Sequence, residues 1–275
     1  MSAVGTPSVD SALWVRRFGG GPAAPGAPGA PGAPGGRGRE PLRLLCLPHA
    51  GGSASVFRPW SAAAGPDIDV LALQYPGRQD RYREPAVANL PRLADLAAPA
   101  VLAGVGDGRY ALFGHSMGAL LAFELTLRLE RAGRAPELLV VSGRRAPSTR
   151  RDGEYDHLTD DRALTAHLRE LSGTDPRLLT DEDALQMILP AVRADLTAVG
   201  GYHAGPEVTV RTPVLALTGD ADPWVTPAEA AAWQRHTTAG FELRIHPGGH
   251  FYLDGREQEL LALLGDRLGL APLPR

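Results

Sequence analysis

Residues 109–119 read RYALFGHSMGA, and this stretch decides the fold. Its first half is a short apolar run, which is typical of a buried strand. Its second half opens residues 117–131, whose apolar spacing predicts a helix. Between the two, Gly114, Ser116 and Gly118 form the pattern G-x-S-x-G. At a turn from strand to helix, this pattern predicts a strained backbone that presents the Ser116 hydroxyl as a nucleophile.

Apolar runs alternate with helical stretches on both sides of this motif. We predict strands at residues 42–48, 69–75, 109–114, 137–143, 213–219 and 241–247. We predict helices near residues 53–64, 90–102, 117–131 and 227–236, and a last one after Gly255. This alternation is typical of a mostly parallel central sheet flanked by helices. Together with the serine turn, it predicts an α/β protein with the α/β-hydrolase fold.

Residues 146–206 interrupt the alternation. They contain no convincing strand, and two stretches, 160–171 and 180–199, have helical spacing. We therefore expect a helical insertion at 146–206 within a core formed by residues 41–145 and 207–275. An insertion at the strand ends, where α/β sheets place their sites, can act as a lid.

The chain begins with a segment of different character. Within residues 1–18, the stretch WVRRF at 14–18 fits a short outer strand. Residues 19–40 read GGGPAAPGAPGAPGAPGGRGRE and have no apolar periodicity. A tract of this composition cannot bury enough apolar surface to offset its ordering entropy, so we expect it to be disordered.

The catalytic partners of Ser116 are sought further along the chain. A serine hydroxyl is a poor nucleophile at neutral pH and needs a base, and α/β-hydrolases supply Ser, Asp or Glu, and His in that order. Residues 218–223 (TGDADP) and 247–251 (PGGHF) each end a predicted strand. They lie on the same sheet edge as Ser116. We therefore predict Asp222 as the orienting carboxylate and His250 as the general base.

Each of these two assignments has a competitor. Asp220 is the alternative to Asp222, but the G-x-x-D spacing after the strand favours Asp222. His246 is the other histidine just after a late strand. His250 has two glycines before it, which let the loop bring the imidazole over the sheet edge.

The negative charge that develops on the substrate oxygen needs two backbone N–H donors. Met117, which follows the nucleophile, supplies the first. Residues 48–52 (PHAGG) close the strand at 42–48, and their glycines permit the backbone to turn toward the site. Ala50 is predicted to be the second donor.

Composition excludes several other classes of function. The net charge of −3 and the pI near 6.2 give no electrostatic footprint for nucleic acid. No apolar run approaches the length of a membrane span, and the first residues lack the features of a secretory signal, so we expect a cytoplasmic protein. The single cysteine, Cys46, lies in an apolar strand as a buried thiol, and no Cys/His cluster offers a zinc site. We expect no metal and no cofactor.

Six blocks of sequence resemble one family, the type II (external, editing) thioesterases of polyketide synthases and nonribosomal peptide synthetases. The blocks are WVRRF at 14–18, LPHAGGSAS at 47–55, YPGRQDR at 75–81, FGHSMGA at 113–119, TGDADPWV at 218–225 and GGHFYL at 248–253. PHAGG and YPGR separate this family from lipases, which the serine motif alone does not. The tract at residues 19–40 departs from the family's pattern.

The resemblance implies hydrolysis of acyl groups from the phosphopantetheine arm of acyl- or peptidyl-carrier proteins. It implies Ser116, Asp222 and His250 as the triad and residues 146–206 as the lid, and the phosphopantetheine belongs to the partner. A small-molecule carboxylesterase or an acyltransferase is the alternative within enzymes, and PHAGG and YPGRQDR count against it. A non-catalytic binding protein is the alternative of another class, and the intact triad order counts against that.

Four arginines open the insertion: Arg144, Arg145, Arg150 and Arg151. They follow a strand that should end on the same sheet edge as Ser116. We therefore expect these side chains near the mouth of the site. The family resemblance implies a carrier protein with an acidic helix, and guanidinium groups pair well with carboxylates and phosphates, so the four arginines can help to dock the carrier. The alternative is an ordinary solvated loop, since a run of charges after a strand is usually no more than that.

Overall fold

The computed structural model describes residues 10–18, 40–151, 153–158, 160–171, 177 and 179–271. Within them, seven strands form one sheet in the order β1-β3-β2-β4-β5-β6-β7. Six of these strands run parallel, and only β1 is antiparallel to its neighbour. The strands are β1 (Val15–Arg17), β2 (Leu42–Leu47), β3 (Ile68–Leu73), β4 (Tyr110–His115), β5 (Leu139–Ser142), β6 (Val214–Gly219) and β7 (Phe241–His246).

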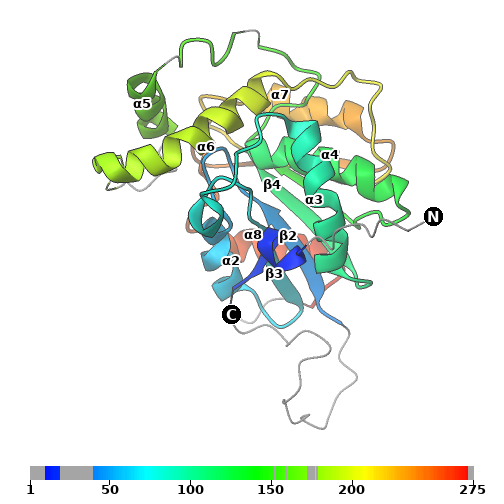
Figure 1. Cartoon of the computed structure of the whole chain (residues 1–275). Coiled ribbons are helices and arrows are strands. Elements are labelled where there is room, and N and C mark those ends of the chain that lie inside the picture. Colours follow the sequence, from blue (N-terminus) through cyan, green and yellow to red (C-terminus); the bar gives the residue numbers. More distant parts are fainter. Residues whose placement is uncertain are drawn as a thin grey trace, which may run out of the picture.

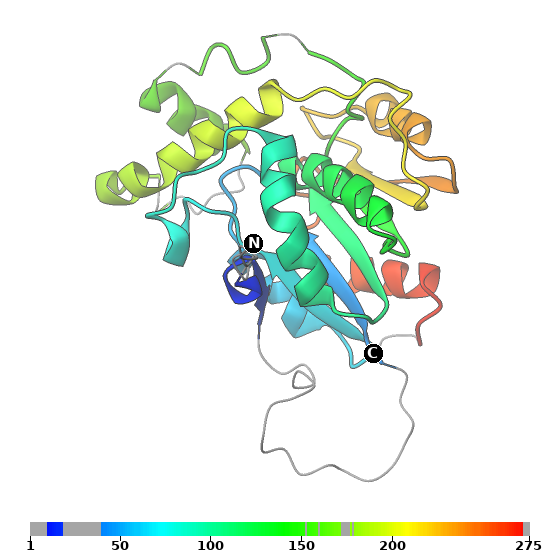
Figure 2. The same cartoon turned by 45° about the vertical axis from the view of Figure 1, so that its right-hand side comes forward.

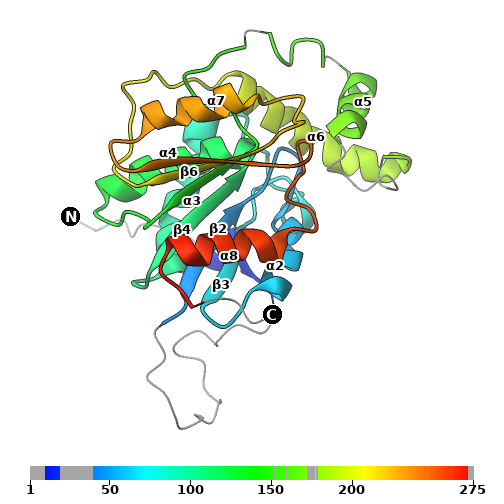
Figure 3. The ribbon, with the colours of Figure 1, turned by 180° about the vertical axis from the view of Figure 1, so that it is seen from behind.

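Helices cover both faces of the sheet. Figure 1 shows α3 and α4 on the near face, and Figure 3 shows α2 and α8 on the opposite face. The helices are α1 (Ser11–Trp14), α2 (Arg58–Ala63), α3 (Leu90–Val105), α4 (Met117–Arg131), α5 (Asp161–Leu171), α6 (Glu182–Gly200), α7 (Pro227–Ala231) and α8 (Glu257–Arg267), with 3₁₀ turns η1 (Ala54–Phe57), η2 (Gln79–Arg81) and η3 (Ala232–His236).

The two helical layers enclose two hydrophobic cores. On β2, Leu45 and Leu47 point into the core under α3 and α4, whereas Leu44 and Cys46 point into the core under α2 and α8. This division follows from the alternation of side chains along a strand. A parallel strand buried on both faces is apolar throughout, which is why the strand sequences read as continuous apolar runs.

The expected mostly parallel sheet flanked by helices is confirmed. All six predicted core strands are present, and the outer strand expected near Trp14 is β1, which pairs Val15 with Leu73 of β3. Two predicted helices differ in part from expectation, because the first begins as η1 before α2 and the other ends as η3 after α7. Pro59 is the second residue of α2, and a proline suits the first turn of a helix.

The insertion between β5 and β6 contains the two helices α5 and α6. Figures 1 and 2 show them beside each other, beyond one end of the sheet. Asp181 caps the start of α6 by accepting a hydrogen bond from the Ala184 N–H at 3.1 Å. The predicted disordered tract at 19–40 lies outside the described residues, apart from Glu40. No helix in the described part of the chain is long and apolar enough to cross a membrane.

Candidate active site

Ser116 lies at a sharp turn between β4 and α4. Its backbone has φ 55° and ψ −117°, a conformation that a residue other than glycine seldom adopts. A Cβ on Gly114 would lie 2.1 Å from the Gly118 carbonyl oxygen, and a Cβ on Gly118 would lie 2.1 Å from that of Leu47. Only glycine fits these two positions. The glycines of the serine pattern are therefore required by the close packing of three backbone segments, namely the ends of β2 and β4 and the start of α4.

A hydrogen bond joins His250 to Asp222. The His250 Nδ1 and Asp222 Oδ2 atoms are 2.9 Å apart, and both residues are buried. Asp222 also accepts a hydrogen bond from the Trp224 N–H at 2.9 Å, which fixes the carboxylate. With Nδ1 engaged, Nε2 is the ring nitrogen that remains for a reacting serine.

The competing carboxylate, Asp220, has a different role. It is exposed and accepts a hydrogen bond from the Gly248 N–H at 2.9 Å, which ties together the loops that carry Asp222 and His250. Its neighbourhood therefore favours Asp222 as the group that orients the imidazole. The other candidate base, His246, lies 3.4 Å from Glu259 and stacks on Tyr252, away from the serine cavity.

One cavity brings the candidate residues together. Ser116, His250, Ala50 and Met117 all line it, and the empty space in and around it is about 440 Å³. No hydrogen bond between Ser116 and His250 is found in the described structure, and catalytic hydrogen bonds often tighten only when substrate binds. The remaining lining residues come mainly from the insertion and the loops after β6 and β7: His49, Arg144, Tyr155, His167, Leu171, Leu196, Val199, Trp224 and Phe251.

Ala50 and Met117 are available as backbone donors. The Met117 N–H is the first of α4 and has no partner inside the helix. The Ala50 N–H makes no hydrogen bond to any residue that the structure describes, whereas the Gly51 N–H is already bonded to Asp195. Two residues that line the serine cavity therefore have backbone N–H groups without a partner among the described residues, and an oxyanion needs two such donors.

Two further histidines surround the candidate base. The His115 and His250 ring centroids are 5.0 Å apart, and His49 packs edge-on against Phe251 at 4.9 Å. Burial, and then the charge of a protonated His250, lower the pKa of His115 well below its ordinary value. The same two causes, with Arg78, lower the pKa of His49 to about 3. Both rings therefore stay neutral beside His250 at neutral pH.

His115 could not be singled out from the sequence, since it occupies a variable position of the serine pattern. The structure shows that its Nδ1 bonds the Ser142 hydroxyl at 2.9 Å, and Ser142 in turn bonds the Tyr252 hydroxyl at 2.7 Å. This chain of polar groups lies in the interior beneath the site. His167 of α5 also lines the cavity. It was not predicted as a site residue, because nothing in the helical pattern of this segment distinguishes it.

The four arginines do not form one exposed group. Arg144 and Arg145 are buried, at 7% and 4% exposure, and both pair with the buried carboxylate of Glu154. Burial by itself would raise the pKa of Glu154, but the Arg145 hydrogen bond and the surrounding guanidinium charges lower it. The expectation that Arg144 and Arg145 help to dock a carrier at the surface is therefore wrong, because both side chains are buried and pair with Glu154.

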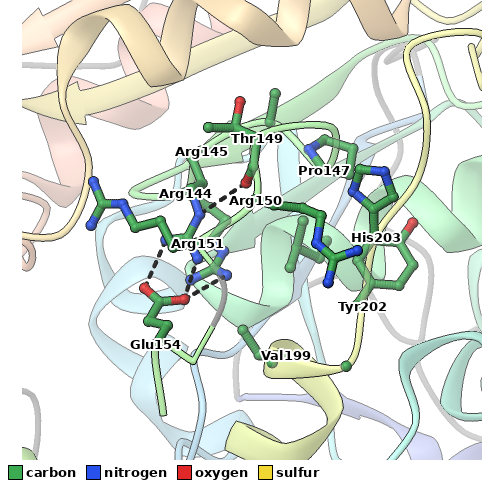
Figure 4. Close-up of a pocket in the computed structure, with 14 residues that line it drawn as sticks. Arg144, Arg145, Pro147, Thr149, Arg150, Arg151, Glu154, Val199, Tyr202 and His203 are labelled. Atoms are coloured by element: carbon green, nitrogen blue, oxygen red, sulfur yellow. Dashed lines mark hydrogen bonds and ion pairs between the residues drawn. The ribbon is translucent and has the colours of Figure 1, made fainter. Parts of the chain in front are cut away.

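Arg150 and Arg151 remain more accessible. Arg150 is exposed, and Arg151 makes a bidentate hydrogen bond to Glu229 at 2.7 and 2.8 Å. Figure 4 shows that all four arginines line a pocket beside Tyr202 and His203. Arg144 and Val199 line both this pocket and the serine cavity, so the two hollows adjoin.

Comparisons with known proteins identify the family of the chain. The chain matches the family described as the thioesterase domain over residues 42–268. It is 44% identical to thioesterase PikA5 of Streptomyces venezuelae, over 95% of this chain and 87% of that protein. It is 34% identical to the gramicidin S biosynthesis protein GrsT of Aneurinibacillus migulanus, over 85% of this chain and 91% of that protein.

Solved structures give the same result. The type II thioesterase BorB from the borrelidin biosynthetic cluster superposes with a TM-score of 0.80 at 44% identity, covering 93% of this chain and 98% of that one. The RedJ thioesterase of the prodiginine pathway in Streptomyces coelicolor superposes with a TM-score of 0.74 at 40% identity, covering 88% and 91%. The resemblance found in the six sequence blocks is thereby confirmed, and the chain belongs to the thioesterase family.

Proposed function

We propose that this protein is a type II thioesterase that removes acyl groups from the phosphopantetheine arm of acyl- or peptidyl-carrier proteins. The observation that carries the proposal is the Asp222–His250 hydrogen bond at the wall of the cavity that also holds Ser116 at its strained turn. Relatives named for gramicidin S biosynthesis and for the borrelidin biosynthetic cluster support the choice of substrate. We propose a cytoplasmic location on the same grounds.

In this mechanism the serine attacks first. The Ser116 Oγ adds to the thioester carbonyl carbon while His250 Nε2 accepts the hydroxyl proton, and Asp222 stabilises the imidazolium. The carbonyl oxygen becomes an oxyanion, which the Ala50 and Met117 N–H groups stabilise. Collapse of this intermediate breaks the C–S bond, and the pantetheine sulfur leaves with the proton from His250.

Water completes the cycle. His250 takes a proton from a water molecule, the resulting hydroxide adds to the acyl-enzyme carbonyl, and the second tetrahedral intermediate collapses to release the carboxylic acid. The Ser116 oxygen recovers its proton from His250. Apart from substrate and water, each step uses only side chains and backbone groups of this chain, so we propose that the enzyme works without a metal or cofactor.

The insertion at 146–206 is proposed to serve as the lid over a core of residues 41–145 and 207–275. Its helices contribute Leu171 from α5 and Leu196 and Val199 from α6 to the serine cavity. These apolar side chains suit an acyl chain, because they bury its surface away from water. Movement of α5 and α6 would admit or enclose the substrate.

A substrate panel tests the proposed function. Turnover is measured on acyl-carrier proteins, on acyl-coenzyme A with the same acyl groups, and on simple esters of the same acids. We expect the largest kcat/KM for the carrier proteins and loss of nearly all turnover in Ser116→Ala and His250→Ala, because triad members act as a unit. A preference for simple esters would instead identify a carboxylesterase. Turnover above a few per cent in folded Ser116→Ala would refute the nucleophile assignment.

Carrier docking is proposed to involve the two accessible arginines. Charge reversal at Arg150 and Arg151 should raise KM for an acyl-carrier protein, and added salt should shrink the penalty as it screens the interaction. Hydrolysis of a small acyl-pantetheine thioester should hardly change, since that substrate presents no protein surface. Because Arg151 also binds Glu229, Glu229→Gln serves as the matched control for loss of that ion pair alone. Equal losses on both substrates would contradict docking.

A further inference from the structure

The loop that carries Ala50 is anchored from three sides. The Tyr75 hydroxyl donates to the Pro48 carbonyl oxygen at 3.0 Å. Arg78 Nη1 donates to the Gly52 carbonyl oxygen at 3.0 Å. The Gly51 N–H donates to Asp195 Oδ2 at 2.8 Å. The first two anchors come from the YPGR segment after β3, and the third comes from α6 of the insertion.

Arg78 and Asp195 also bind each other directly. Nη1 and Nη2 of Arg78 lie 2.8 and 2.9 Å from Oδ2 and Oδ1 of Asp195, a bidentate pair. Arg78 is 7% exposed and Asp195 is 1% exposed, and the guanidinium also lies over the Tyr75 ring. Desolvation offsets much of the attraction in such a buried pair, so the pair is weak evidence for stability. Its constraint on geometry is the more informative property.

Helix α6 packs directly against the same loop. A Cβ on Gly51 would lie 2.9 Å from Val192 Cγ2, and Gly51 has φ +75°, which favours glycine. The Ala50 side chain packs against the apolar cluster of the insertion, which contains Val192 and Leu196. The loop is thus in close contact with α6 as well as with the YPGR segment.

We propose that Arg78 and Asp195 are positioning residues for the oxyanion donor at Ala50. Asp195 fixes the neighbouring Gly51 N–H, Arg78 fixes Asp195 and the Gly52 carbonyl, and together they hold the intervening backbone at the serine cavity. Because Asp195 belongs to α6, seating of the insertion and completion of the oxyanion hole are a single event. The open enzyme lacks a fully formed oxyanion hole. This inference rests on the proposed role of Ala50.

The test separates positioning from stability. Asp195→Asn keeps the side-chain shape but replaces one of the two acceptor oxygens with an NH2 donor and removes one charge, so the side chain can no longer accept from the Gly51 N–H and from both Arg78 nitrogens at once. A second variant, Arg78→Met with Asp195→Leu, removes both charges, and replacing a buried pair by apolar residues is often neutral for stability. On a small acyl-pantetheine thioester, we expect kcat to fall between roughly 10-fold and 100-fold in both variants, less than loss of a whole donor would cause. KM should stay within about threefold of the wild type, since the donors act on the transition state.

Glu130→Gln is the matched control. Glu130 is a buried carboxylate at the end of α4 that accepts hydrogen bonds from the Arg211 and Thr212 N–H groups, and it does not line the serine cavity. Glu130→Gln keeps the acceptor oxygen but loses the charge that strengthens its hydrogen bonds, so it should lower the melting temperature and leave kcat within about twofold, because no donor at the site moves. Hydrogen exchange of the peptide at residues 47–57 should rise in Asp195→Asn and not in Glu130→Gln.

The possible outcomes are distinct. If both Asp195 variants retain kcat within threefold of the wild type while folded, the inference is wrong. It is equally wrong if kcat follows the melting temperature across all variants, Glu130→Gln included. Ser116→Ala is measured in parallel on the same thioester. Turnover by folded Ser116→Ala would overturn the proposed nucleophile, and a wild type that does not hydrolyse the thioester would overturn the proposed function. An inactive Ser116→Ala beside fully active Asp195 variants would overturn only the inference.

Discussion

Mild acid should destabilise the protein through His115. This side chain is 1% exposed, and burial, followed by the charges of His250 and His49, lowers its pKa well below the ordinary value of 6.5. In the unfolded chain His115 regains that ordinary pKa, so the unfolded state binds more protons as the pH falls below 6.5. The stabilising contribution is therefore complete above pH 6.5 and declines below it, down to the pKa of the folded state.

The size of this effect follows from the difference between the two pKa values. With His115 neutral in the folded state, protonation of the unfolded chain lowers the free energy of unfolding at pH 5.5 by about 1.4 kcal/mol relative to pH 7.5. In a protein of this size, that loss lowers the melting temperature by about 3–6 °C. Other groups titrate in the same range, so the wild type alone does not isolate His115.

His115→Asn isolates the contribution. The asparagine amide can take the place of Nδ1 beside the Ser142 hydroxyl but does not titrate. Urea unfolding at pH 7.5 and 5.5 gives the acid-induced loss of unfolding free energy for each protein. The wild type should lose about 1.4 kcal/mol more than the variant, whatever the stability of the variant at pH 7.5. Equal losses in the two proteins would refute the reasoning, since His115 would then titrate alike in both states.

Two further outcomes follow from the site. Asp222→Asn should lower kcat by about 10⁴-fold, because it removes the carboxylate that orients His250, whereas Asp220→Asn should lower kcat far less. Steady-state kinetics on one thioester measures both effects. The reverse order would assign the orienting role to Asp220. Gly118→Ala should not give folded, active protein, because its Cβ would overlap the Leu47 carbonyl oxygen at 2.1 Å; a soluble variant with a wild-type melting temperature would contradict that contact.

Local patterns in the sequence were enough to predict the sheet and to select many of the residues of the candidate site. Ser116, Asp222 and His250 each follow an apolar strand, and parallel strands carry the residues after them to one sheet edge. The same logic selected the loop of Ala50. Departures from prediction were local: turn geometry near Pro59 replaced the first turn of a helix with η1, since 3₁₀ turns are frequent at helix ends.

Contacts between residues far apart in the sequence could not be predicted from local patterns. Arg78 and Asp195 are 117 positions apart, and only the path of the insertion shows that α6 returns to the YPGR segment. The prediction for the arginines after β5 failed for a related reason. A run of charges in a loop usually predicts a solvated surface, but Glu154 supplies a buried partner for Arg144 and Arg145.

The three residues of β1 also have a consequence for the behaviour of the protein at high concentration. All six side chains of β3 are buried, and β1 occupies the outer edge of β3 from Leu71 to Leu73, with Arg17 bound to Asp69 at 2.6 Å. Without β1, an apolar strand would present unpaired N–H and C=O groups, a template for strand addition from another copy. A short, arginine-bearing edge strand discourages such pairing. By covering the edge of β3, β1 thus disfavours self-association and aggregation through that edge.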